Sequence, residues 1–152
     1  MHSIEPQIME LLAELDVRVM AEEETFARLR QQKPLTELTL EEQETITQMM
    51  LAVGSETGKF LNLLLKTQGS KRILDLGTSF GYSIIYLAEA ARANGGRVTT
   101  LDYDVAKQVQ ASAYIQQVGL QEVVDFKLGD AMELLDGLPG PWDFVLLDLS
   151  KQ

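Results

Sequence analysis

The chain has 152 residues, 45% of them hydrophobic, which is enough for the core of one domain, and its 23 acidic and 13 basic residues give a net charge of -10. This surplus of acid repels phosphate backbones and anionic lipid surfaces, so we expect no nucleic-acid partner and no membrane partner. The lack of cysteine and the single histidine, His2, exclude a disulfide, a thiolate nucleophile, a zinc–cysteine cluster and a serine–histidine triad in the body of the chain.

Residues 1–70 have the apolar spacing of helices. The apolar residues of a long first helix, which ends at Pro34, recur at steps of three and four: Ile4, Ile8, Leu11, Leu15 and Val19. Thr39 and Glu42 have the spacing of a capping box and begin a second helix, with Met49 and Met50 on its apolar face. The first helix is acidic where a signal peptide would be basic and then apolar, so we expect a cytoplasmic protein.

Beyond a third helix over residues 55–67, the pattern changes to short apolar runs that alternate with helical segments. The predicted strands are 72–76, 98–101, 123–127 and 144–147, and the helices between them are 83–92, 106–118 and 131–135. Parallel strands need a crossover between them, so this alternation predicts an α/β fold with a Rossmann-like, doubly wound parallel sheet whose strands are all buried. We therefore divide the chain into an N-terminal helical cap, residues 1–70, and an α/β domain, residues 71–152.

The fourth predicted strand, residues 144–147, is wholly apolar. A sheet that ended there would expose a bare apolar edge, which proteins normally cover. We therefore expect the α/β domain to be incomplete at its C-terminus. The same edge, or the apolar stripe of the first helix, also predicts a homodimer.

Ligands of doubly wound sheets bind at the carboxyl ends of the strands, and the first strand ends in an informative turn. Asp75 is followed by Gly77, Ser79 and Gly81. A dinucleotide fingerprint needs glycine where Ser79 and Tyr82 stand, so the phosphate-binding pattern fails at two of its three glycines. The turn that remains brings backbone close to a ligand, and it favours a nucleoside-like ligand without phosphate.

Acidic residues follow the other three strands. Asp102 follows the second strand, where a carboxylate can accept two hydrogen bonds from a ribose diol. Asp130 follows the third strand and can either reach an adenine amino group or only cap the next helix. Asp148 follows the fourth strand, with Lys151 three residues later. Carboxylates at one sheet edge suit a cation, and S-adenosylmethionine (SAM) combines a sulfonium, an amino group, a ribose diol and an adenine without phosphate.

Four segments together carry a family resemblance. They are I-L-D-L-G-T-S-F-G-Y-S from Ile73, V-T-T-L-D-Y-D from Val98, G-D-A from Gly129 and F-V-L-L-D-L-S-K from Phe144. This combination resembles the cation-dependent O-methyltransferases, class I SAM-dependent enzymes related to catechol and caffeoyl-CoA O-methyltransferases. The family has a seven-stranded sheet, of which this sequence carries four strands.

The resemblance implies a role for individual residues. The cofactor-binding residues would be Val53, Asp75, Gly77, Ser79, Gly81, Tyr82, Ser83, Asp102, Tyr103, Asp130, Ala131 and Asp148. Asp75 would line the methionine moiety of SAM, and Tyr82 and Ser83 would open the helix beside its carboxylate. Asp102 would hold the ribose hydroxyls, and Ala131 would border the adenine.

The same resemblance implies the chemistry. Asp148 would ligate a divalent metal, Mg²⁺, which lowers the pKa of a bound hydroxyl, and Lys151 would be the general base that removes the hydroxyl proton. In the family the other metal ligands and most of the acceptor pocket follow the fourth strand, so Asp148 alone would leave the metal site incomplete.

The hypothesis is a SAM-dependent O-methyltransferase that methylates a hydroxyl of a small, aromatic, catechol-like acceptor. Two alternatives stay open at this point. One is a catalytically inactive SAM-binding fragment, and the other is an NAD-dependent oxidoreductase, with which Ser79 and Tyr82 conflict.

Overall fold

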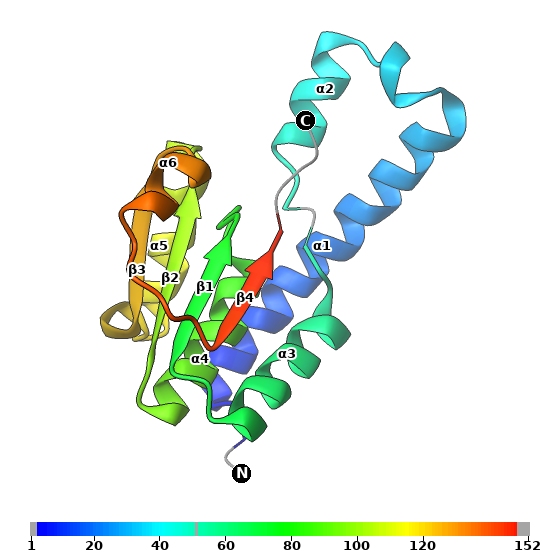
Figure 1. Cartoon of the computed structure of the whole chain (residues 1–152). Coiled ribbons are helices and arrows are strands. Elements are labelled where there is room, and N and C mark those ends of the chain that lie inside the picture. Colours follow the sequence, from blue (N-terminus) through cyan, green and yellow to red (C-terminus); the bar gives the residue numbers. More distant parts are fainter. Residues whose placement is uncertain (1–2, 51, 149–152) are drawn as a thin grey trace.

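A computed structural model describes residues 3–50 and 52–148 of the chain (Figure 1). Its α-helices are α1 (Pro6–Gln32), α2 (Leu40–Thr47), α3 (Ser55–Gln68), α4 (Tyr82–Asn94), α5 (Val105–Gln117) and α6 (Ala131–Asp136). Its strands are β1 (Arg72–Leu76), β2 (Arg97–Asp102), β3 (Val124–Leu128) and β4 (Phe144–Leu147), and short 3-10 turns cover Leu35–Glu37 and Gln121–Val123. Each predicted helix and strand is therefore present.

The strands form one parallel sheet in the order β3-β2-β1-β4. The chain runs outward from β1 to β2 and β3 and then returns to the other side of β1, so the order reverses between β1 and β4. Ile73 pairs with Val98 on one side and with Phe144 on the other, which puts these three residues on the same face. The doubly wound parallel fold is confirmed, and its topological switch point lies between β1 and β4.

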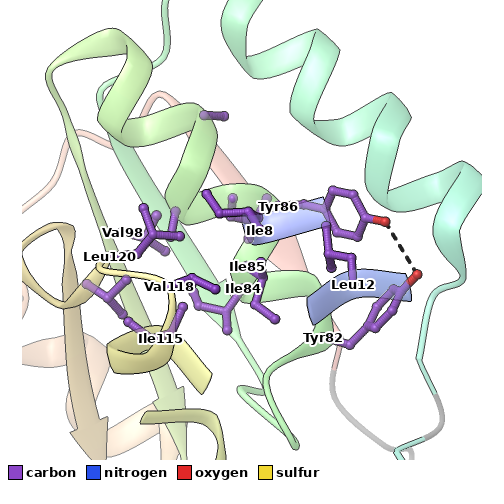
Figure 2. Close-up of a cluster of buried hydrophobic side chains, with 14 of the residues drawn as sticks. Ile8, Leu12, Tyr82, Ile84, Ile85, Tyr86, Val98, Ile115, Val118 and Leu120 are labelled. Atoms are coloured by element: carbon purple, nitrogen blue, oxygen red, sulfur yellow. Dashed lines mark hydrogen bonds between the residues drawn. The ribbon is translucent and has the colours of Figure 1, made fainter. Parts of the chain in front are cut away.

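Helix α4 is buried on both sides. All of its residues from 82 to 91 are buried, because the sheet covers one side and α1 and α3 cover the other (Figure 1). In Figure 2, Ile8 and Leu12 of α1 lie beside the aromatic rings of Tyr82 and Tyr86 of α4. A helix with apolar residues on most of its circumference needs cover on every side, and α1 and α3 complete the cover of α4.

The apolar stripe of α1 faces this core as predicted. Its buried residues are Ile8, Leu11, Leu12, Leu15 and Val19. The end of α1 and the whole of α2 extend away from the sheet in Figure 1. Within residues 3–50 and 52–148, no helix is long and apolar enough to cross a membrane.

The opposite face of the sheet is covered only in part by the described residues. Leu74, Leu76 and Leu101 pack under α6 and Trp142. Val145 and Leu147 of β4 share this face but stay 48% and 69% exposed. The prediction that all strands are buried holds for β1 and β2 and is wrong for β3 and β4, because these two strands are the edges of the sheet.

The second predicted helix is shorter than its sequence pattern indicates. The capping box of Thr39 and Glu42 is present, but α2 ends at Thr47, so Met49 and Met50 are not helical. In a continuing helix, the backbone N–H of Met50 would donate to the carbonyl of Ile46. It donates instead to the carboxylate of Glu22 on α1, at 2.7 Å, and this contact is incompatible with another helical turn.

Helices α3 and α4 approach closely at a glycine. A Cβ on Gly58 would lie within 2.8 Å of Tyr86 Cζ and would overlap the ring. Next to it, Asn62 donates to Glu89 Oε2 at 2.6 Å, and Glu89 also forms a buried ion pair with Lys66 at 2.7 Å. These contacts hold α3 against α4 and thereby set the position of residues 52–54, which precede α3.

Gly58→Ala is expected to lower the free energy of unfolding by about 1–3 kcal/mol, although alanine is the better helix former, because the buried Tyr86 ring has no room to move. Urea unfolding followed by circular dichroism measures the change. Thr57→Ala, at the exposed neighbouring position of α3, is the control and should change the midpoint little. An unchanged or higher midpoint for Gly58→Ala would contradict this packing.

Candidate functional site

A cavity of about 240 Å³ lies at the carboxyl ends of the strands. Its lining comes from the ends of all the strands of the sheet and from the segment after α2. The lining residues are Met49, Met50, Gly77, Ser79, Leu101, Asp102, Tyr103, Asp104, Lys107, Gly129, Ala131 and Asp148. This is the edge of a doubly wound sheet at which ligands bind.

The turn after β1 has an unusual backbone that is fixed to the end of β2. Gly77 and Gly81 have positive φ angles of 107° and 95°, and Ser79 has a φ of 49°, which is uncommon for a residue with a side chain. The N–H of Gly77 donates to the carbonyl of Leu101 at 2.8 Å, and the N–H of Ser79 donates to Asp102 Oδ2 at 2.7 Å. Strain of this kind persists where neighbouring contacts enforce it, and it is typical of binding sites.

The carboxylate of Asp102 is held in one orientation. Its Oδ2 accepts the Ser79 N–H, and its Oδ1 accepts the N–H of Asp104 at 2.9 Å. Each carboxylate oxygen has a second lone pair, so both can still accept a hydrogen bond from a ligand in the cavity. The predicted role, accepting two hydrogen bonds from a ribose diol, is compatible with this geometry.

Asp75 is completely buried at the end of β1. Its Oδ2 accepts a hydrogen bond from Thr100 Oγ1 at 2.7 Å, while its Oδ1 has no partner within the described part of the chain. Burial raises the pKa of Asp75 to about 7; the Thr100 hydrogen bond opposes this rise, and the charges of Asp148 and Asp102 add to it. A buried carboxylate of this kind is stabilised by a positive charge that binds near it.

The charged groups of the lining are mostly acidic. Asp102, Asp104 and Asp148 face one lysine, Lys107, whose ammonium lies 5.4 Å from the centre of the Phe80 ring. Burial also raises the pKa of Asp148. Three carboxylates around one cavity favour a cationic ligand and repel the two phosphates of a dinucleotide.

Six of the predicted cofactor-binding residues line this cavity. They are Gly77, Ser79, Asp102, Tyr103, Ala131 and Asp148. Asp75 and Gly81 lie outside the lining. The Cα of Gly81 packs on α5, where a Cβ would come within 2.7 Å of Ala111 Cβ.

The other predicted residues make different contacts. Tyr82 and Ser83 begin α4 as predicted, but both are buried, and the Tyr82 hydroxyl donates to Asp16 on α1. Asp130 caps α6 by accepting the N–H groups of its first turn, which is the capping alternative for this residue. Val53 lines a separate hollow between α1 and the start of α3.

Sequence reasoning did not assign the other lining residues to the site. They are Met49, Met50, Leu101, Asp104, Lys107 and Gly129. Asp104 and Lys107 begin α5 directly after Asp102, so their place in the chain could have indicated them. The sequence predicts that Met49 and Met50 are core residues. Both are buried, and they also form a wall of the cavity.

Of the predicted metal ligand and the predicted general base, only the metal ligand, Asp148, lies within the described residues. Asp148 lines the cavity, but within residues 3–50 and 52–148 no group of three acidic or histidine side chains could hold a metal ion. The described residues therefore do not make a complete Mg²⁺ site. Lys151 lies outside the described residues.

Comparisons with known proteins agree on one family. A family model described as O-methyltransferase matches residues 22–152. A catechol O-methyltransferase of Niastella koreensis is 38% identical over 105 residues, which are 66% of this chain and 47% of that protein. The chain therefore spans about half the length of the curated relatives it matches.

Solved structures show the same similarity in space. An O-methyltransferase from Bacillus cereus, in complex with S-adenosylhomocysteine (SAH), is 26% identical with a TM-score of 0.61 and covers 95% of this chain and 55% of that chain. The O-methyltransferase TomG from Streptomyces achromogenes, in complex with SAM, is 33% identical with a TM-score of 0.59 and covers 62% of this chain and 44% of that chain.

Asp75→Asn is expected to make the protein more stable at neutral and alkaline pH. The pKa of Asp75 in the folded protein, about 7, lies above the ordinary aspartate value of 3.8. Protonated Asp75 therefore favours the folded protein, and this advantage is lost as the pH rises through 7. The gain from an uncharged Asn should therefore be about 2–4 kcal/mol near pH 8 and small near pH 4.

Urea unfolding at the two pH values measures this difference. Asp136→Asn removes an exposed acid and serves as the control, with little effect at either pH. An equal effect of Asp75→Asn at both pH values would show that the charge of Asp75 is not the destabilising feature.

Proposed function

Because the chain belongs to the O-methyltransferase family, we propose that it acts in SAM-dependent methylation of a hydroxyl group on a small, aromatic, catechol-like acceptor. The observation that carries the proposal is the cavity at the switch point. Its lining is acidic, the carboxylate of Asp102 is held in one orientation, and the turn after β1 lacks the glycines of a phosphate-binding turn. A ligand that is cationic and nucleoside-like, and that lacks phosphate, matches these properties.

The cavity residues support a specific arrangement of the cofactor. Asp102 would accept the ribose hydroxyls, and Gly129 and Ala131 would border the adenine at the end of β3. The apolar walls of Met49 and Met50 would exclude water from the ligand. Asp75, whose Oδ1 has no hydrogen-bond partner among the described residues, would favour the positive charges of the methionine end.

The chemistry proposed is one displacement. SAM supplies a methyl group on a sulfonium: the acceptor oxygen forms a bond to that carbon, the sulfur–carbon bond breaks, and SAH leaves. Lys151, as the neutral amine, would take the hydroxyl proton. Asp148 is the proposed ligand for Mg²⁺, although the described residues do not complete its site.

Two other sequence-based proposals accompany this function. The homodimer and the cytoplasmic location rest on sequence alone. An NAD-dependent oxidoreductase is disfavoured, because the carboxylates of Asp102, Asp104 and Asp148 would oppose a pyrophosphate in the cavity. Inactive SAM binding differs from the proposed function only in turnover.

Calorimetric melting with SAH and with NAD tests the cofactor. SAH should raise the midpoint of the wild-type chain and NAD should not, since only a ligand that binds the folded state stabilises it. Asp102→Asn keeps the shape of the side chain but removes one acceptor and the charge, and it should weaken SAH binding about tenfold. Asp136→Asn is the matched control. A midpoint that responds to NAD and not to SAH would refute the proposal.

Methyl transfer from labelled SAM to catechol in the presence of Mg²⁺ tests turnover. Lys151→Ala should reduce the rate by about 10²–10⁴-fold while leaving SAH binding unchanged, as expected for loss of a general base. SAH binding without any transfer by the wild-type chain would favour the inactive alternative.

A further inference from the structure

The Met49–Met50 wall, residues 49 and 50, is the part of the cavity lining that precedes the sheet in the chain. It lies between α2 and α3, and its side chains are 5% and 1% exposed. Both residues line the cavity together with Gly77 and Ser79 of the turn after β1. Since neither residue is in a helix or a strand, contacts from elsewhere must fix the position of this wall.

Two side chains of α1 hold the wall through its backbone. Glu22 Oε2 accepts the N–H of Met50 at 2.7 Å, and Arg18 donates to the carbonyl of Gln48 at 3.1 Å. The two side chains are one helical turn apart and are joined by a 2.7 Å ion pair between Arg18 Nε and Glu22 Oε1. We call this pair and its two backbone contacts the α1 clamp.

The α1 clamp also contacts the turn after β1. The Arg18 guanidinium lies 4.9 Å from the centre of the Phe80 ring, on the residue that follows Ser79. The hydroxyl of Ser79 donates to the carbonyl of Met50 at 3.4 Å. The wall is therefore held between α1 and the turn after β1, which also lines the cavity.

We propose that Arg18 and Glu22 are positioning residues that keep Met49 and Met50 in the wall of the cofactor cavity. This inference rests on the proposed function. Neither side chain lines the cavity, so both act through the backbone of residues 48–50. The carboxylate of Glu22 forms a charge-assisted hydrogen bond with Met50, which is stronger than one between neutral groups.

The clamp competes with a continuation of α2. The sequence pattern of α2 extends to Met49 and Met50. The carbonyl of Ile46 accepts the N–H of Met49 at 3.0 Å, and in a continuing helix it would accept the N–H of Met50, which Glu22 holds instead. The backbone of residues 48–50 would then turn into the helix and move both methionines relative to the cavity. Glu22 thus selects the conformation that the cavity needs.

The test compares Glu22→Ala and Glu22→Gln with Glu14→Ala, which removes an exposed acid from the same helix. SAH affinity is measured by calorimetry, and amide exchange is measured at residues 48–50. Glu22→Ala should weaken SAH binding about tenfold, corresponding to the loss of one charge-assisted hydrogen bond. Glu22→Gln should lie between it and the wild type, since its amide oxygen can still accept the Met50 N–H. Glu14→Ala should bind as the wild type does.

The location of any change in amide exchange distinguishes loss of the α1 clamp from a general loss of stability. Faster exchange of the Met50 amide in Glu22→Ala, with α4 still protected, supports the clamp, because a general loss of stability would affect α4 as well. Unchanged affinity together with unchanged exchange at Met50 would overturn it. If Glu22→Ala does not fold, Arg18→Met, which keeps an apolar stem over Phe80, provides the same measurements, and unchanged values there overturn the inference.

Failure of the proposed function gives a different pattern. A wild-type chain that does not bind SAH refutes the function, whereas the exchange of the Met50 amide still tests the clamp by itself. Faster exchange in Glu22→Ala would then support the clamp as the element that holds the wall, and equal exchange would overturn it.

Discussion

The burial of α4 on both sides is the constraint from which the rest of the arrangement follows. Residues 82–91 are buried on every side of the helix and most of them are apolar, so the sheet covers one side of α4 while α1 and α3 cover the other. Packing α1 there brings Arg18 and Glu22 beside the carboxyl end of β1. The core of the protein and the wall of its cavity are therefore set by one packing requirement.

The fold could be predicted because its signals are local. Apolar runs of strand length, glycines after helices and a capping box at Thr39 indicate their elements without reference to the rest of the chain. Sequence-based predictions failed where a contact between distant residues determines the structure. Helix α2 ends at Thr47, and the N–H of Met50 donates to Glu22, which lies 28 residues away in the sequence. The exposure of Val145 and Leu147 likewise depends on what covers the sheet, which local sequence does not state.

The site was predictable to the extent that it follows strand ends. Gly77, Asp102 and Asp148 come directly after strands, and the parallel topology brings them to one edge. Tyr82 shows the limit of such reasoning, because the helical period of α4 turns its side chain toward α1 and away from the cavity. A residue that follows a binding turn in the sequence contributes to the site only if the helix or strand that contains it orients its side chain toward the cavity.

The acidity of the cavity links ligand charge to protonation. Asp75 has a raised pKa because its charge is buried near two other carboxylates, and its Oδ1 has no hydrogen-bond partner in the described chain. A cation bound nearby stabilises the ionised form, so its binding lowers the pKa of Asp75 and is coupled to release of the Asp75 proton. Affinity for such a ligand therefore rises with pH until Asp75 is ionised in the free protein and then becomes constant. The same buried charge that destabilises the empty fold thus favours a cationic ligand over a neutral or anionic one of the same shape.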